Sequence, residues 1–237
     1  MGAQAQGHLN AAPTFGSGAR TIDRIVFGAA PSRYRDRVDA LRSACAAMSG
    51  LGAPISIVSR CERVEALLTA FQEPLGRDFD AYRGHVYRAI TYAMRFLDDD
   101  EAFRPLIETA FVYHDIGLWT DRELAYLEPS EALALADNER YGWGLDPTLL
   151  RNTIHWHHRI TPCRGPNARV VEAARKADWI DASGSRRRMG LPKAEVRAVE
   201  EAIPSYDFAD VLQRLAGDLG GNRITGTFKV LRAVLKV

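Results

Sequence analysis

Apolar residues recur at spacings of three and four along most of this chain, which is the pattern of amphipathic helices. The clearest case is the segment 81–97, where His85, Ala89, Tyr92 and Phe96 form one stripe with further apolar residues beside it. Equivalent patterns elsewhere predict an all-α fold. The expected helices span residues 32–48, 55–71, 81–97, a segment ending at 115, 130–140, 147–160, 168–183, 193–202, 207–219 and 225–237.

Turn-forming residues divide these helices. The stretch Glu73–Gly76 is expected to interrupt one of them. Asp146 followed by Pro147 is a strong helix start, because aspartate caps a helix and proline fits its first position. From this organisation we expect a flexible tail and three helical parts. Their boundaries are 1–22 for the tail, 23–75 for N-terminal helices packing on the core, 76–185 for the core and 186–237 for C-terminal helices.

Asp178 is the most informative polar residue of the pattern. On the predicted helix 168–183 it falls in one narrow arc with Val171, Ala174 and Ala182, so its carboxylate belongs to the face that is expected to be buried. A buried carboxylate without a partner is strongly unfavourable. The pattern therefore requires a cation, which is either an Arg or Lys side chain or a metal ion.

His114 and Asp115 end an apolar segment of helical period. His114 shares one face of this helix with Ile107 and Phe111, so we expect its imidazole to point inward. Asp115 lies about 100 degrees round the helix from His114. Because it is near the helix end, its carboxylate can still reach the same point as the His114 imidazole. Gly117 is expected to let the chain turn away.

Ligand-type side chains are therefore expected to converge from separate helices. His85 lies at the edge of the buried face of the helix 81–97, with Asp181 expected behind the ligands. Imidazole combined with carboxylate suits a divalent transition metal. This combination favours a metal ion over an Arg or Lys partner, with the ligands His85, His114, Asp115 and Asp178.

These residues form a series: a histidine, a His-Asp pair about thirty residues later, and an aspartate about sixty residues beyond that. Their surroundings read YRGHVYRA, FVYHDIGLW and KADWIDAS. Over roughly residues 76–185, the series resembles the HD-domain superfamily of metal-dependent phosphohydrolases. The resemblance implies an HD-domain helical bundle in which the four residues hold one divalent metal ion. The identity of the ion stays open among Zn, Mn, Fe, Ni, Co and Mg.

A second group of histidines lies in the segment NTIHWHHRI. On the helix begun at Pro147, His157 falls at the centre of the apolar face, His158 at its edge and His155 on the polar side. In some branches of the superfamily, an adjacent histidine pair in this region helps to bind a second metal. That form needs one more histidine, and residues 116–154 contain none. We therefore expect one metal, with His157 or His158 as a catalytic hydrogen-bond donor or acid; the alternative is that all three histidines only pack or face solvent.

Composition and charge limit the classes of binding partner that we expect. The chain has 31 Lys and Arg against 30 Asp and Glu, a net charge of +1, so we expect no nucleic acid and no membrane partner. No apolar run reaches the length of about 18 residues that a membrane span needs. The three cysteines form no CxxC pair and no disulfide framework. These features predict a cytoplasmic protein.

An anionic small-molecule substrate requires local positive charge near the metal. Arg88 is the preferred candidate, because it lies on the same side of its helix as His85. The other candidates are Arg83, Arg159 and Lys176. The apolar faces of the C-terminal helices predict either a cap over the bundle or the surface of a homodimer.

From the ligand set we expect a metal-dependent phosphohydrolase that uses activated water on a small phosphorylated molecule such as a nucleotide. Two alternatives stay open. The resemblance also includes a cyanamide hydratase-like zinc lyase and di-iron oxygenases, and a small neutral substrate would suit the aromatic surroundings of Tyr82, Tyr92, Trp119, Trp156 and Trp179. The missing histidine counts against the di-iron form. The second alternative is a non-catalytic helical module with a structural metal.

Overall fold

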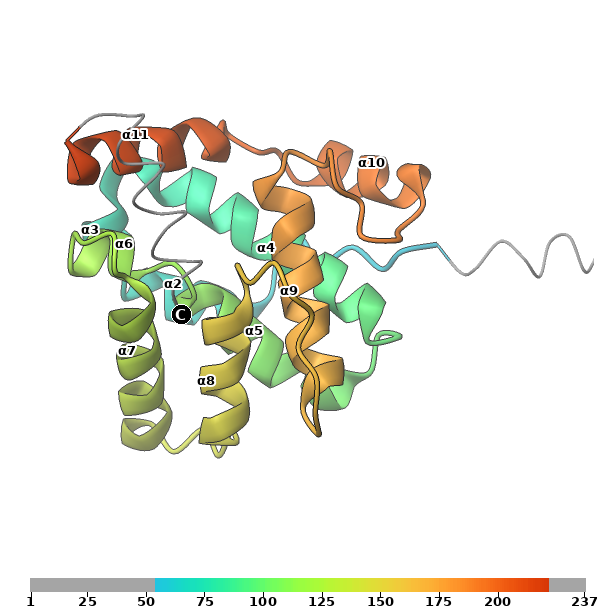
Figure 1. Ribbon diagram of the computed structural model, residues 1–237, viewed down its shortest axis with the longest axis horizontal. Helices are drawn as coiled ribbons and strands as arrows, with labels where there is room; N and C mark the ends of the chain where they lie inside the picture. The colour runs from blue at the N-terminus through green and yellow to red at the C-terminus, as the bar shows by residue number, and fades with distance from the viewer. Residues whose placement is uncertain (1–53, 222–237) are drawn as a thin grey trace, which may run out of the picture. The chain divides into compact units, whose positions relative to one another are not determined.

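The computed structural model describes residues 54–221, and every regular element in this range is a helix (Figure 1). The all-α fold class expected from the sequence is thus confirmed. None of the described helices is long and apolar enough to cross a membrane. The tail predicted at 1–22 and the helices predicted at 32–48 and 225–237 lie outside the described residues.

Helix α4 (Phe79–Phe96) is the central element. Helix α9 (Ala168–Ala182) packs along it, and α5 (Arg104–Tyr113) packs against it as well (Figure 1). Every residue from Gly84 to Met94 is buried, because other helices cover α4 on several sides. His85 is consequently 0% exposed, whereas the sequence placed it at the edge of the buried face.

Helices α7 (Leu127–Arg140) and α8 (Pro147–Trp156) lie side by side (Figure 1). The side-chain amide of Asn138 holds the loop between them: it donates to the backbone oxygen of Leu145 at 2.9 Å and accepts from the backbone nitrogen of Leu145 at 3.1 Å. The Asp146 carboxylate then caps α8 by accepting from the Leu149 N–H at 2.8 Å. The helix start predicted from Asp146 and Pro147 is confirmed.

Helices α10 (Lys193–Ala202) and α11 (Phe208–Gly220) follow α9 in the chain and both contact α4. A two-point ion pair between Arg95 and Glu195, with both nitrogen–oxygen distances at 3.0 Å, ties α10 to the end of α4. The shorter elements complete the described range. They are α2 (Glu62–Thr69), α3 (Gln72–Leu75), η1 (Gly76–Asp78), η2 (Glu101–Phe103) and α6 (Gly117–Thr120).

The helix predicted over 55–71 begins only at Glu62. Residues 54–61 are not helical, and two hydroxyl groups of α4 bind their backbone instead: Val58 N–H donates to Thr91 Oγ1 at 3.1 Å and Cys61 N–H to Tyr87 Oη at 3.0 Å. The predicted interruption at 73–76 contains the short helix α3. Proline is tolerated there because the first turn of a helix needs no backbone N–H donor.

Candidate metal centre

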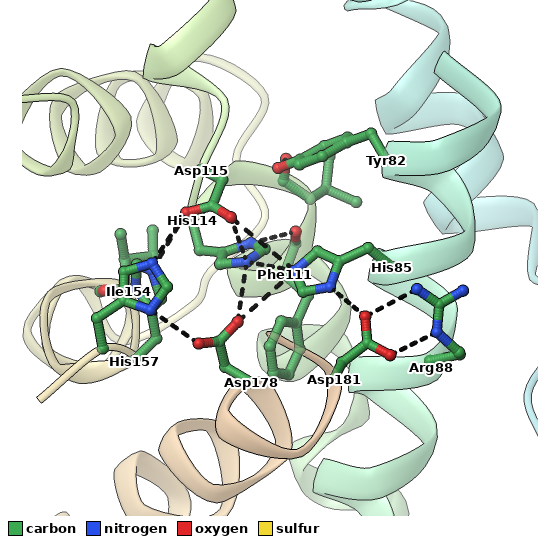
Figure 2. A network of polar contacts seen from close by, with 12 residues as sticks. Tyr82, His85, Arg88, Phe111, His114, Asp115, Ile154, His157, Asp178 and Asp181 are labelled. Atoms are coloured by element: carbon green, nitrogen blue, oxygen red, sulfur yellow. Dashed lines mark hydrogen bonds and ion pairs between the residues drawn. The ribbon is translucent and has the colours of Figure 1, made fainter. Parts of the chain in front are cut away.

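The four predicted metal ligands meet at one buried point (Figure 2). His85 comes from the middle of α4, His114 from the C-terminal end of α5, Asp115 from the turn after it and Asp178 from α9. His85 Nε2 and His114 Nε2 lie 2.9 Å apart, and His114 Nε2 lies 3.2 Å from Asp115 Oδ2. Asp178 Oδ1 lies 3.6 Å from each of the two Nε2 atoms.

These separations are those of ligands around one ion. Atoms bound at about 2.1 Å to a divalent metal stand about 3.4 Å apart in a tetrahedron and about 3.0 Å apart when adjacent in an octahedron. The distances that join the two Nε2 atoms to each other and to the two carboxylates run from 2.9 Å to the 3.9 Å between His85 Nε2 and Asp115 Oδ2. A divalent ion could therefore be held by His85, His114 and Asp115, with Asp178 beside the two imidazoles.

The second nitrogen of each imidazole fixes which atom faces the centre. His85 Nδ1 donates to Asp181 Oδ2 at 2.7 Å, and His114 Nδ1 donates to the backbone oxygen of Phe111 at 2.8 Å (Figure 2). Since Nδ1 carries the proton in both rings, each neutral imidazole turns a bare Nε2 lone pair inward. Two lone pairs that face each other at 2.9 Å repel unless a cation or an added proton lies between them.

His157 and His158 extend the cluster on its other side. His157 Nδ1 donates to the backbone oxygen of Ile154, and its Nε2 lies 3.2 Å from Asp115 Oδ1. His158 Nδ1 lies 2.9 Å from Asp178 Oδ2, and its Nε2 lies 3.7 Å from Asp115 Oδ1. Asp115 thus belongs to two triads that could each hold a metal ion: one with His85 and His114, the other with His157 and His158.

Unpaired polar atoms gather at this point. Within residues 54–221, buried side-chain atoms without a hydrogen-bond partner include Asp115 Oδ1, His157 Nε2 and both carboxylate oxygens of Asp178. All four are acceptors, and leaving such groups unpaired costs about 1–3 kcal/mol each, with charged groups costing more. Positive charge bound within this cluster would give these acceptors a partner, so the residues present fit a divalent metal.

The C-terminal ends of two helices also favour a cation at this centre. Helix α5 ends at Tyr113, with His114 as its C-terminal cap, and α8 ends at Trp156 with His157 as its cap. The C-terminal end of a helix carries a partial negative charge, which favours a cation nearby. The helix predicted to extend to residue 160 instead ends at Trp156; His157 keeps helical backbone angles, and its ring Nδ1 donates to the Ile154 carbonyl oxygen.

Without a metal ion, protons take its place. Burial alone lowers the pKa of His114, but the negative charges of Asp115 and Asp178 raise it overall, to about 10. Burial raises the pKa of the Asp178 carboxyl, yet the charge of His158 and the neighbouring imidazoles bring it well below its usual value. Burial, with the charge of His158, lowers the pKa of His157 to about 4. The cluster therefore holds positive charge both with a bound metal ion and with protons in its place.

Metal affinity is expected to rise with pH. His114 keeps a proton up to about pH 10 in the absence of a metal, so a metal ion must displace that proton. The affinity should rise about tenfold per pH unit for each proton displaced between about pH 6 and pH 9. Chelator competition at several pH values measures this slope, and a pH-independent affinity would show that the cluster holds no displaceable proton.

Asp181 and Arg88 support the ligand His85 from behind. Two guanidinium nitrogens of Arg88 donate to the Asp181 carboxylate, at 2.5 and 2.8 Å (Figure 2). The third nitrogen donates to the backbone oxygen of Pro204 at 2.7 Å. The expected place of Asp181 behind the ligands is the one observed. A carboxylate on Nδ1 orients the ring of His85 and raises the basicity of its Nε2.

Replacing Asp181 with asparagine should lower metal affinity about 10- to 100-fold, because His85 loses the charged partner of its Nδ1. Chelator competition on the purified variant measures the change. Asp210→Asn, at an exposed position on α11, is the matched control and should bind metal as the wild type does. An unchanged affinity in Asp181→Asn would mean that this contact does not tune the ligand.

The basic residues expected to bind substrate lie in different surroundings. Arg83 pairs with Glu65 at 2.6 Å and lies over the Tyr87 ring, and Lys176 lies over the ring of Phe96. Arg159, next in the chain to His158, lies over the Trp156 ring. No ion pair or hydrogen bond described here joins these residues or Arg88 directly to the four ligands.

The third histidine, His155, is outside both triads. Its Nδ1 lies 2.7 Å from Glu131 Oε1, and its Nε2 lies 3.5 Å from the Arg159 guanidinium. The sequence placed His155 on the polar side of its helix, in agreement with this contact. Trp119, Tyr92 and Trp179, which the sequence grouped as aromatic surroundings, bind Asp78, the backbone of Val196 and the backbone of Arg159 respectively.

Two aromatic residues at the centre were missed by the sequence analysis. Phe208 of α11 stacks on the His85 ring, with centroids 4.2 Å apart and planes at 13 degrees. Tyr126, just before α7, lies 6.4 and 6.3 Å from the rings of His157 and His158. Tyr126 precedes its helix and therefore has no periodic signal. Phe208 lies in the helix predicted at 207–219, whose apolar face was expected only to cap the bundle or to form a homodimer surface.

No protein-family model, curated protein or solved structure matches this chain. The chain is therefore described by its own geometry: an all-α protein with a buried His and Asp cluster that could hold a metal ion. That description is compatible with the resemblance to HD domains found in the sequence.

Proposed function

We propose that this protein is a metal-dependent phosphohydrolase of the HD-domain type, acting on a small phosphorylated molecule such as a nucleotide. The observation that carries the proposal is the convergence of imidazole nitrogens on two buried carboxylates, in which Asp115 Oδ1 and both oxygens of Asp178 have no hydrogen-bond partner. His85, His114, Asp115 and Asp178 would hold the ion. A divalent ion held there supplies an activated water near neutral pH and polarises a phosphoryl oxygen.

The chain's own residues would then orient the substrate and move protons. His158 is the one member of the two triads with appreciable exposure, with 19% of its side chain accessible against 0–1% for the others. Substrate can therefore approach from the side of His158, which is placed to give a proton to a leaving group. Arg159 follows it directly and is the basic residue best placed to meet a phosphate.

One observation favours a second function, a lyase that adds water to a small neutral molecule. The guanidinium of Arg88 is fully engaged inside the protein, and the charges of Arg83 and Lys176 are bound elsewhere. Three of the four basic residues expected to attract phosphate are thus committed to other partners. A neutral substrate has no need of them.

The test is metal analysis followed by a screen. Purified protein is loaded separately with Mn, Co, Ni, Mg or Zn, and phosphate release is measured from a nucleotide panel and from p-nitrophenyl phosphate. Metal-dependent phosphate release would support the phosphohydrolase. Bound metal with hydration of small nitriles or cyanamide and no phosphate release would support the lyase, and bound metal without either activity would support a structural ion. The same analysis gives the number of equivalents, one or two, for the two triads.

A further inference from the structure

The metal centre is poor in hydrogen-bond donors. The Nδ1 protons of three imidazoles are donated to acceptors of the protein; these imidazoles are His85, His114 and His157. The other groups that face the centre include the carboxylates of Asp115 and Asp178. Phosphate oxygens are acceptors as well. A substrate bound among acceptors needs at least one protein donor that faces it.

Tyr126 supplies a hydroxyl group at this place. The residue is 2% exposed, and its ring lies beside the rings of both His157 and His158. Burial, the negative charges of Asp115 and Asp178, and hydrogen bonding to Asp115 raise the pKa of the Tyr126 hydroxyl well above its usual value. Tyr126 therefore lies beside the triad of Asp115, His157 and His158, next to the partly exposed His158.

The other tyrosine at the centre is committed differently. Tyr82 is also fully buried and stacks near His114, with centroids 6.2 Å apart. Its hydroxyl, however, donates to the backbone oxygen of Val112 at 2.9 Å. Because a backbone carbonyl accepts that proton, the Tyr82 hydroxyl is already bound within the wall of the site, whereas within residues 54–221 no backbone carbonyl accepts a hydrogen bond from the Tyr126 hydroxyl.

Gly117 explains how Tyr126 reaches this position. A Cβ at residue 117 would stand 2.6 Å from the backbone oxygen of Tyr126, so only glycine allows this approach. Gly117 N–H donates to Ser130 Oγ at 3.0 Å, and Ser130 N–H donates to the Tyr126 oxygen at 3.0 Å. The segment after the His-Asp pair is thus pinned to the segment that carries Tyr126. The sequence assigned Gly117 to a turn; it instead begins α6 and serves close packing.

We propose that Tyr126 is a catalytic residue whose hydroxyl turns from Asp115 to an oxygen of the substrate and donates a hydrogen bond to it. The identity of that substrate as a phosphate rests on the proposed function. The donor role itself applies to any small anion that binds at an open position of the ion. No covalent step and no change in the protonation of Tyr126 is involved.

The experiment compares Tyr126→Phe with wild type in anion binding to the Co²⁺-loaded protein. Isothermal titration calorimetry measures the affinity for inorganic phosphate and, separately, for azide, and metal analysis measures the bound Co²⁺. Loss of a hydrogen bond to a charged acceptor should weaken anion binding at least about tenfold. Bound Co²⁺ should be unchanged, because phenylalanine keeps the ring and its packing.

Tyr92→Phe is the matched control. Tyr92 is a fully buried tyrosine of α4 whose hydroxyl meets the backbone oxygen of Val196 at 3.4 Å, away from the centre. This variant should bind metal and both anions as the wild type does. Equal weakening in the two variants would reveal a general packing effect and overturn the proposal.

Each of the other outcomes also tests the role of Tyr126 or the proposed function. Wild-type anion affinity in Tyr126→Phe would overturn the donor role, and loss of Co²⁺ would show that Tyr126 only stabilises Asp115. Wild-type protein that binds azide but no phosphate would contradict the phosphohydrolase, while the azide comparison would still decide the role of Tyr126. Binding of neither anion by the loaded wild type would mean that the ion has no open position, which contradicts both proposals.

Discussion

Asp178→Ala is expected to lower metal affinity by more than about 100-fold, since loss of a supporting contact alone typically costs 10- to 100-fold and Asp178 is a direct ligand candidate. Its Oδ1 stands 3.6 Å from both inward imidazole nitrogens, and its Oδ2 stands 2.9 Å from His158 Nδ1. Among the described residues, Asp115 is the other carboxylate that reaches both of these inward imidazole nitrogens. Metal-dependent activity should fall with the metal.

Two measurements test this expectation. Elemental analysis gives bound metal after dialysis, and the thermal shift on adding metal reports binding independently: a ligand at 100 times its Kd stabilises a protein by about 2.7 kcal/mol. Asp210→Ala, at an exposed position on α11, is the control and should behave as wild type. A normal metal content in Asp178→Ala with normal folding would show that the ion, if any, sits elsewhere.

The ligand set could be predicted because each member interrupts an apolar helical pattern. Burying a charged or imidazole side chain at a position such as Asp178, on one helix face with Val171 and Ala174, is unfavourable unless another group binds it. Such a position can be recognised from the sequence alone. The structure brings His85, His114 and Asp115 into one triad that could hold a metal ion, and it places Asp178 Oδ1 3.6 Å from both imidazole nitrogens. Burial and helical period therefore carried most of the information about the centre.

The partners of the arginines could not be predicted in the same way. Helical period places Arg88 on the side of His85, which is the side observed, but it does not say which carboxylate is nearer to the guanidinium. Asp181 is 93 residues away in the chain and reaches Arg88 through the packing of α9 on α4. Such pairings depend on how helices pack, and that information is absent from the pattern of a single helix.

Segments without a period were hardest to predict. Residues 55–61 were expected to be helical, yet the backbone of Val58 and Cys61 bonds to side chains of α4. Tyr126 precedes α7 and reaches the centre because Gly117 leaves room for its backbone. Both cases involve contacts between parts of the chain that are distant in sequence, so propensity alone favoured a different structure.

Arg88→Met should destabilise the fold by about 3–5 kcal/mol, the usual cost of removing one partner of a buried ion pair. The side chains of Arg88 and Asp181 are 3% and 6% exposed, so water cannot compensate for the lost guanidinium. Asp181 would keep only His85 as a partner, and the backbone oxygen of Pro204 would lose its donor. Urea denaturation gives the free energy of unfolding.

Arg83→Met is the matched control, because both arginines lie on α4 and both were expected to bind substrate. The Arg83 and Glu65 side chains are 27% and 25% exposed, and a pair of this kind contributes at most about 1 kcal/mol. A large loss in Arg88→Met beside a small one in Arg83→Met would assign Arg88 to the support of His85. Normal stability in Arg88→Met together with weaker phosphate binding would instead mean that Arg88 leaves Asp181 to meet the substrate.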